Sequence, residues 1–196
     1  MNIHQLSVTY LPEEDRILAR INTTAGEEMR LWLTRRLMLG LWPLLSKTMT
    51  GQLLRLEAAG SSLETASDEL KTMLADFRKQ EFLQNADFDT PYKDEEAILP
   101  LGAEPLLVTD VDAAPMPNGR LRLSFNENRP SKAEPKPEPR KFQMEMEPRL
   151  MQGLLHLLEQ ALVQSRWRDA FEPAASAEDP TQPDAASHSN RPRYLN

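Results

Sequence analysis

The chain has 196 residues, 23 Lys and Arg against 30 Asp and Glu, 40% hydrophobic residues, 16 prolines and no cysteine. These figures exclude a disulfide framework, a Cys-based metal site, a thiol nucleophile and a collagen-like or wholly disordered chain. The net charge of −7 argues against wholesale binding to nucleic acid or anionic lipid, because the summed field repels phosphates. No motif specifies an activity.

The first residues carry no basic leader and no apolar run, so we expect no export signal. The richest apolar stretch, 37–45, is about half as long as a membrane-spanning helix. Together with the lack of cysteine, this predicts a cytoplasmic protein that does not enter a membrane.

Residues 6–33 alternate between apolar and polar side chains with the period of β-strands. The alternation runs through 6–10, 17–21 and 29–33, and turn-forming residues separate these segments. We therefore expect a three-stranded antiparallel meander with one apolar face.

From Thr34 the spacing changes to three and four residues, which is typical of amphipathic helices. One stripe runs from Leu37 to about 59, and Pro43 either kinks this helix or marks its true start. Residues 60–62 provide a stop and a new N-cap, and a second stripe runs over 63–84. The pattern predicts an antiparallel helical hairpin over 35–84.

The second half of the chain predicts more strands and one helix. Asn118-Gly119 favours a tight hairpin turn, and Pro148 suits the first turn of a helix that ends near 168. The expected segments are an acidic loop over 85–96, strands at 98–99, 106–111, 119–126 and 141–146, a Pro-rich linker over 128–140, and a disordered tail over 169–196.

These elements predict a single α+β domain over residues 1–168. We expect one antiparallel sheet of about six to seven strands, with the helical hairpin inserted after the third strand and the C-terminal helix packed on the sheet. The strands at 119–126 and 141–146 are expected hairpin partners, because closing a long loop costs little more than closing a short one.

One face of the meander is the best candidate for a partner-binding surface. A turn centred on Ala25 places Arg20 opposite Arg30, and two facing arginines repel unless an anion lies between them. Either phosphate or an acidic partner binds there, or Glu27, Glu28 or another carboxylate neutralises the arginines. The candidate residues are Arg16, Leu18, Arg20, Arg30, Trp32, Arg35 and Arg36.

Arg35 and Arg36 lie where the third strand passes into the first helix. Cations in a first helical turn oppose the helix dipole by a few tenths of a kcal/mol each. They therefore either bind an anion or, as we favour, form salt bridges with the acidic segment 87–96.

The sequence favours no catalytic, cofactor or metal site. An EF-hand alignment from Asp87 puts Tyr92 where a glycine is needed and Ile98 where the bidentate Glu belongs. The histidines, His4, His156 and His188, are far apart and belong to no catalytic motif.

Apolar residues cover well over a third of the first helix, which is more than one antiparallel neighbour can bury. The remainder packs on the sheet, on another copy or on another protein.

Three blocks of the chain, 6–18, 31–36 and 142–158, carry a resemblance to a known group of sequences. They resemble an uncharacterised family of small proteobacterial proteins, and the resemblance implies no activity and no functional residues. The leading hypothesis is a non-enzymatic protein-interaction module, or a subunit of a homo-oligomer or larger assembly. The alternative is a nucleic-acid-associated protein that uses its arginines.

Overall fold

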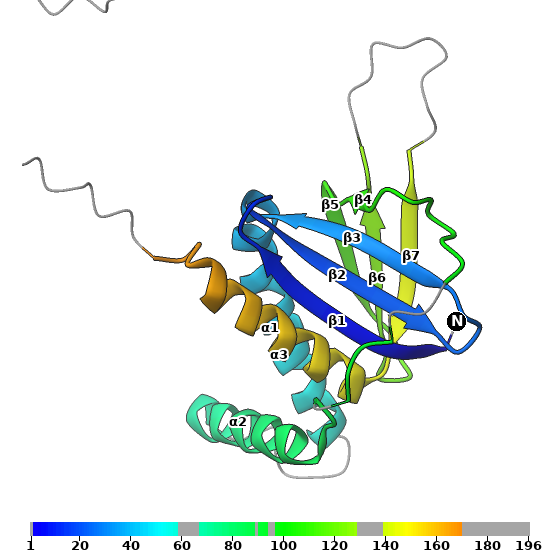
Figure 1. The fold of residues 1–196 in the computed structure, drawn as a ribbon. Helices are drawn as coiled ribbons and strands as arrows, with labels where there is room; N and C mark the ends of the chain where they lie inside the picture. Colours follow the sequence, from blue (N-terminus) through cyan, green and yellow to red (C-terminus); the bar gives the residue numbers. More distant parts are fainter. Residues whose placement is uncertain (1, 59–66, 89, 94–96, 129–138, 170–196) are drawn as a thin grey trace, which may run out of the picture.

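The computed structural model describes residues 2–58, 67–88, 90–93, 97–128 and 139–169. Its elements form two β-sheets and a set of helices packed beside them (Figure 1). The expected linker over 128–140 and the tail over 169–196 fall almost entirely outside the described residues. The predicted α+β class is confirmed.

The first sheet contains the predicted meander. It has the order β1 (Ile3–Leu11), β2 (Arg16–Thr23), β3 (Glu28–Thr34) and β4 (Leu106–Leu107). The meander is antiparallel, and its register places Arg20 opposite Arg30 and Leu18 opposite Trp32, as the alternation predicted. β4 instead runs parallel to β3. The predicted strand at 98–99 is reduced to one parallel bridge between Ile98 and Glu27.

The second sheet is an antiparallel unit of β5 (Asp110–Pro115), β6 (Leu121–Asn126) and β7 (Lys141–Met146). Gly119 has a φ of 81° in the turn between β5 and β6, a conformation that glycine adopts without steric cost. β6 and β7 pair along their whole length, as predicted, although most of the segment between them lies outside the described residues.

The prediction of one sheet of six to seven strands is wrong, because the chain changes sheets between two consecutive residues. The Val108 N–H donates to Trp32 in the first sheet at 3.0 Å, and the Thr109 N–H donates to Asn126 in the second at 2.9 Å. Two sheets can bury their apolar faces against each other, which one flat sheet cannot do. The alternation along each strand is the same in either arrangement.

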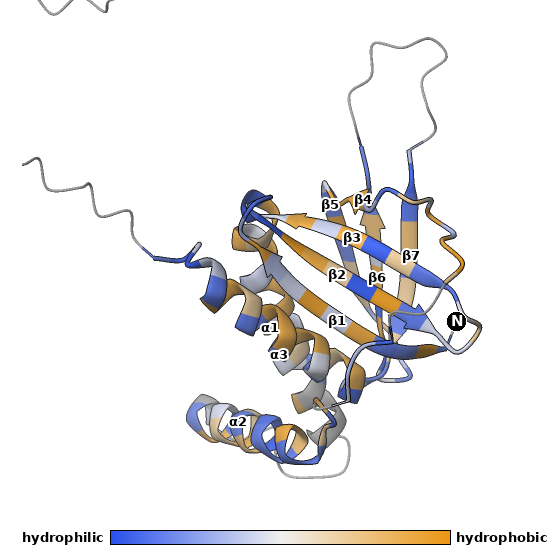
Figure 2. Ribbon diagram, viewed as in Figure 1, coloured by the Kyte–Doolittle hydropathy of each residue, from blue (hydrophilic) through white to orange (hydrophobic). Residues whose placement is uncertain are grey.

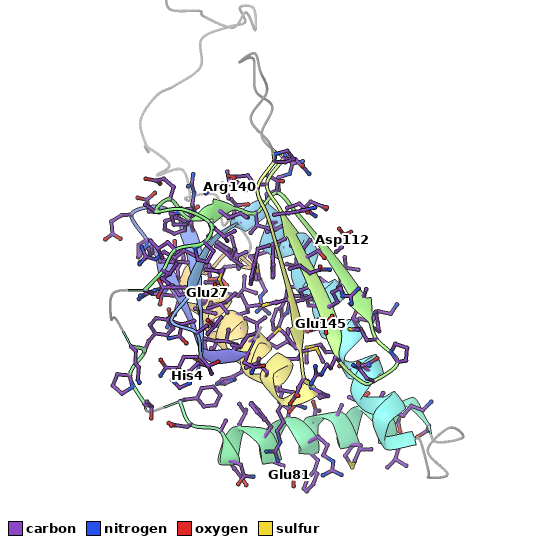
Figure 3. All side chains as sticks on the ribbon, turned by 90° about the vertical axis from the view of Figure 1, so that its right-hand side faces the viewer. His4, Glu27, Glu81, Asp112, Arg140 and Glu145 are labelled. Atoms are coloured by element: carbon purple, nitrogen blue, oxygen red, sulfur yellow. The ribbon has the colours of Figure 1, made fainter. Side chains whose placement is uncertain are left out.

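Arg140 holds the two sheets together where β7 begins (Figure 3). Its guanidinium donates to the buried Glu127 carboxylate and to the carbonyls of Leu101 and Glu104, both at 2.9 Å. The other Glu127 oxygen accepts from the Leu107 N–H at 3.2 Å. This pair therefore ties the segment leading to β4 to the end of β6.

Helix α3 (Pro148–Ser165) follows β7 directly and packs on the first sheet at β1, as predicted. Pro148 occupies its first turn, where the missing N–H costs no intrahelical bond. The core combines apolar side chains of both sheets with those of α3 and α1 (Figure 2). Its largest fully buried members are Ile17, Ile21, Leu31, Met38, Leu106, Leu121, Leu123, Met146, Met151 and Leu162.

Helix α1 (Arg35–Ala58) continues through Pro43, so this proline is not the helix start. Helix α2 (Asp68–Asn85) begins five residues later than predicted, because its N-cap is Ser67, whose hydroxyl accepts from the Leu70 N–H at 3.3 Å. The predicted stop at 60–62 lies outside the described residues.

The two helices do not form the predicted side-by-side hairpin. Both views show α2 below α1 and α3 and inclined to α1 (Figures 1 and 3), and residues near the middle of all three helices line one small cavity between them. α1 instead packs its buried face on the sheets and on α3. Within the described ranges, no helix combines the length and apolar character that a bilayer crossing needs.

Candidate interaction site

The outward face of β2 and β3 brings five of the predicted residues together. The register places Arg16, Leu18 and Arg20 on the same face as Arg30 and Trp32. All five are partly buried. This surface is called the arginine face below.

Glu28 lies between the two facing arginines. It is on the same side of β3 as Arg30, and its side chain is only 2% exposed. One carboxylate oxygen accepts from the Arg20 Nη2 at 2.9 Å and from the Tyr92 hydroxyl at 2.9 Å, and the other accepts from the Arg30 Nε. The reading in which a strand carboxylate neutralises the arginines is therefore the one that the geometry supports.

The electrostatics of Glu28 follow from these donors. Burial raises the pKa of the Glu28 carboxyl, but hydrogen bonds from Arg30, Arg20 and Tyr92 outweigh the burial and bring this pKa below its ordinary value. Glu28 is therefore ionised at neutral pH. Its single negative charge offsets one of the two positive charges that Arg20 and Arg30 would offer to a phosphate.

Tyr92 covers part of the arginine face, a contact that the sequence did not predict. Its ring lies under the Arg20 guanidinium at 4.4 Å, in a cation–π arrangement. The backbone on either side is held to β1, because the Gln5 side chain donates to the Pro91 carbonyl and accepts from the Lys93 N–H. The segment predicted as a solvated acidic loop thus covers the sheet with an aromatic side chain.

Arg35 and Arg36 do not join this face. The Arg35 Nη2 donates to the Trp167 carbonyl at 3.3 Å, and the exposed Arg36 lines a groove between α1 and the β4–β5 connection. Neither forms the expected salt bridge with the 87–96 segment in the part of that segment that the structure describes.

A second polar cluster joins the β1–β2 turn to the end of α3. Asp15, at a φ of 45°, accepts from the Trp167 Nε1 at 2.7 Å and from the Tyr10 hydroxyl at 2.9 Å. The bond from Trp167, followed by that from Tyr10, lowers the pKa of Asp15, and the bond to Asp15 raises the pKa of Tyr10. The cluster holds Trp167 in the core, which is a structural role.

Among the described side chains, α2 carries three exposed large apolar residues. Leu70, Met73 and Phe77 are 50%, 68% and 60% exposed, and their spacing of three and four residues puts them on one side of the helix. The carboxylates of Glu69 and Asp76 lie beside Met73 and line the same shallow hollow. The exposed face of α2, defined by these five residues, is thus apolar with an acidic border.

The described residues offer little acid–base or metal chemistry. They contain no group of three or more His, Asp or Glu side chains placed to hold a metal ion. His156 lies 3.0 Å from the Gln160 amide and packs against the Phe88 ring, and His188 lies outside the described residues.

No protein-family model, curated protein or solved structure matches the chain.

Proposed function

We propose that the protein is a non-enzymatic interaction module that docks the exposed face of α2 on a partner protein. The observation that carries this proposal is the exposure of Leu70, Met73 and Phe77 on one side of a formed helix. A contiguous exposed apolar patch with a polar border is typical of a docking surface. An amphipathic helix that buries such a stripe in a groove is a common recognition mode.

The border of this face indicates the chemistry of the partner. Glu69 and Asp76 follow one edge of the stripe, and the other edge carries Lys71 and Arg78 together with Glu81, which is ion-paired with Arg78 at 2.7 Å. Lys or Arg side chains around an apolar groove would complement these carboxylates. We therefore assign the partner as a protein with an apolar groove and a basic rim.

The same charges argue against an antiparallel second copy of the chain as the partner. In an antiparallel pair of α2 helices, like edges face each other, so Glu69 approaches Asp76. In a parallel pair, the edge with Glu69 and Asp76 instead approaches the edge with Lys71 and Arg78. The antiparallel arrangement therefore brings carboxylates together, whereas a basic rim on a different protein does not.

Energetics favour a contact of moderate strength. Full burial of one Leu, Met or Phe side chain contributes about 1.5–3 kcal/mol before the costs of association. Because α2 is already helical, docking does not require the helix to form. Burial of the three apolar side chains of the stripe is therefore a large part of the binding free energy that a small interface can supply.

The nucleic-acid alternative has weaker support. Arg20 and Arg30 share the Glu28 carboxylate, and Tyr92 stacks on Arg20. The cytoplasmic location and the proteobacterial family resemblance stay predictions from the sequence.

The test is affinity capture from a lysate of the source organism with the wild type and two double variants. M73S/F77S removes the stripe, and L44S/V163S removes two equally exposed apolar residues, 64% and 68%, from α1 and α3. We expect one protein to be retained stoichiometrically by the wild type and by L44S/V163S, and to be lost from M73S/F77S and at high salt.

Two outcomes contradict the proposal. The first is a partner that M73S/F77S still retains, and the second is no stoichiometric partner at all. Light scattering adds a separate check, because a wild-type dimer that M73S/F77S converts to a monomer would identify a second copy as the occupant.

A further inference from the structure

The molecule contains a cavity of about 610 Å³ that lies apart from the exposed face of α2 and adjoins the arginine face only at Tyr92. It is open to solvent on one side and is bordered by the beginning of β1, the end of α2 with residues 86–88, 90 and 92, and the first half of α3. Figure 3 shows His4, one of its lining residues, between the first sheet and α2. The volume falls within the range of about 300–1,000 Å³ that is typical of small-molecule sites.

The walls of this cavity are mainly apolar. The apolar lining residues are Ile3, Leu6, Phe82, Phe88, Leu150 and Leu157. Phe82 and Phe88 meet edge to face with ring centroids 6.4 Å apart. A ligand with an apolar body can bury that body against side chains from three separate elements.

The charged lining groups differ in whether they already have partners. Glu147 accepts from the Arg120 Nη2 at 2.8 Å, and Asp87 accepts from the Thr90 N–H at 3.0 Å and from its hydroxyl at 2.6 Å. Arg149 is the one charged lining residue in the described chain with neither a hydrogen bond nor an ion pair. Glu147 is thus already paired with a cation, Asp87 has neutral donors from Thr90, and Arg149 is the cation of this lining that can meet an anionic ligand.

The start of α3 places backbone N–H donors near Arg149. Arg149 lies in its first turn, and Glu147, the N-cap residue, makes no side-chain capping bond. The first N–H groups of a helix have no intrahelical acceptor and attract anions. An anionic group beside Arg149 would reach both the guanidinium and this helix end.

We infer that this cavity binds a small hydrophobic carboxylate, with the carboxylate against Arg149 and the apolar body against the Phe82 and Phe88 walls. Arg presents paired N–H donors that match the two oxygens of a carboxylate. The site is independent of the proposed docking face, because Leu70, Met73 and Phe77 do not line it.

The test uses octanoate as the probe and 1-octanol as its neutral counterpart, measured by calorimetry and by amide shifts in NMR spectra of the full chain. The variant is Arg149→Gln, and the matched control is Arg36→Gln, another exposed arginine in a first helical turn. We expect saturable octanoate binding with shifts at β1, the 86–92 loop and the first half of α3.

Arg149→Gln should weaken octanoate binding about 10- to 100-fold, the usual value of a charge-assisted pair. Arg36→Gln should leave octanoate binding unchanged, and octanol should bind the wild type and Arg149→Gln equally. Equal affinity for octanoate and octanol, no loss in Arg149→Gln, or shifts confined to other regions would overturn the inference. Loss of the protein partner in M73S/F77S has no bearing on this result.

Discussion

Helices α2 and α3 both have 18 residues, but they differ in how much of their apolar surface is buried. α3 buries Met151, Leu154, Leu158, Ala161 and Leu162 against the rest of the core. No described side chain of α2 is fully buried, and three of its large apolar residues are at least half exposed. The comparison shows that an apolar stripe in a sequence does not reveal whether the protein itself covers that stripe.

The difference in burial follows from the segments that connect each helix to the rest of the chain. β7 ends at Met146, and α3 begins two residues later at Pro148, so the short connection places α3 on the neighbouring apolar face. α2 is attached through longer segments and lies on the outside of α1 and α3, so that only one side of it meets the rest of the fold. The other side is left for solvent or for a partner.

The largest effect that would sharpen this comparison comes from a matched pair of Leu→Ala substitutions. Leu158→Ala in α3 should lower the free energy of unfolding by about 2–5 kcal/mol, because it leaves a cavity in the core. Leu70→Ala in α2 should change it by less than about 0.5 kcal/mol, because Leu70 is half exposed. Urea denaturation followed by circular dichroism measures both values. Comparable losses would mean that the stripe of α2 is covered within the protein.

An intermediate effect is expected at Glu28, which helps to hold the loop that follows α2. Glu28→Gln keeps the shape but removes the charge that receives three donors, so it should cost about 1–3 kcal/mol. Thermal unfolding of the variant against the wild type measures the loss. A neutral result would show that the loop and α2 are attached without this cluster.

The pH dependence of this loss has a definite sign. The lowered pKa of Glu28 means that the folded protein binds its proton less readily than the unfolded chain does. The stabilisation is therefore present above the unfolded pKa and is lost as pH falls through the folded pKa. The difference between the wild type and Glu28→Gln should narrow on acidification, whereas the Asp15 contribution, which has the same sign, remains in both proteins.

The smallest expected effect is a gain in stability where the two helices meet. Gly153 of α3 faces Phe82 of α2, and a Cβ at this position would lie 3.6 Å from the Phe82 ring, which is an ordinary contact. Gly153→Ala should stabilise the protein by about 0.5–1 kcal/mol, because alanine loses less backbone entropy in a helix. Denaturant titration measures this gain, and a loss would show that α2 and α3 lie closer together than this contact implies.

Local patterns in the sequence predicted the elements that depend on neighbouring residues. The alternation over 17–21 and 29–33 predicted β2, β3 and the Arg20–Arg30 register, which are confirmed. Asn118-Gly119 predicted the hairpin of the second sheet, and Pro148 predicted the start of α3. Each of these depends on contacts within a strand pair or a single helical turn.

The candidate site was only partly predictable for the same reason. The facing arginines and Glu28 as their neutralising group follow from strand register. The part played by Tyr92 does not, because Tyr92 is 64 residues from Glu28 in the chain. The Trp167–Asp15 bond spans 152 residues and has no local signal.

The sequence by itself determined the α+β class, the meander with its register and the start of α3, which ends at Ser165 rather than near 168, because backbone hydrogen bonds and side-chain periodicity are local. Only the tertiary structure decided that the strands divide into two sheets and that α2 lies on the outside of α1 and α3. These features depend on which apolar faces bury each other across the whole chain. The alternation or period of a single segment is the same whether its apolar face is covered or exposed.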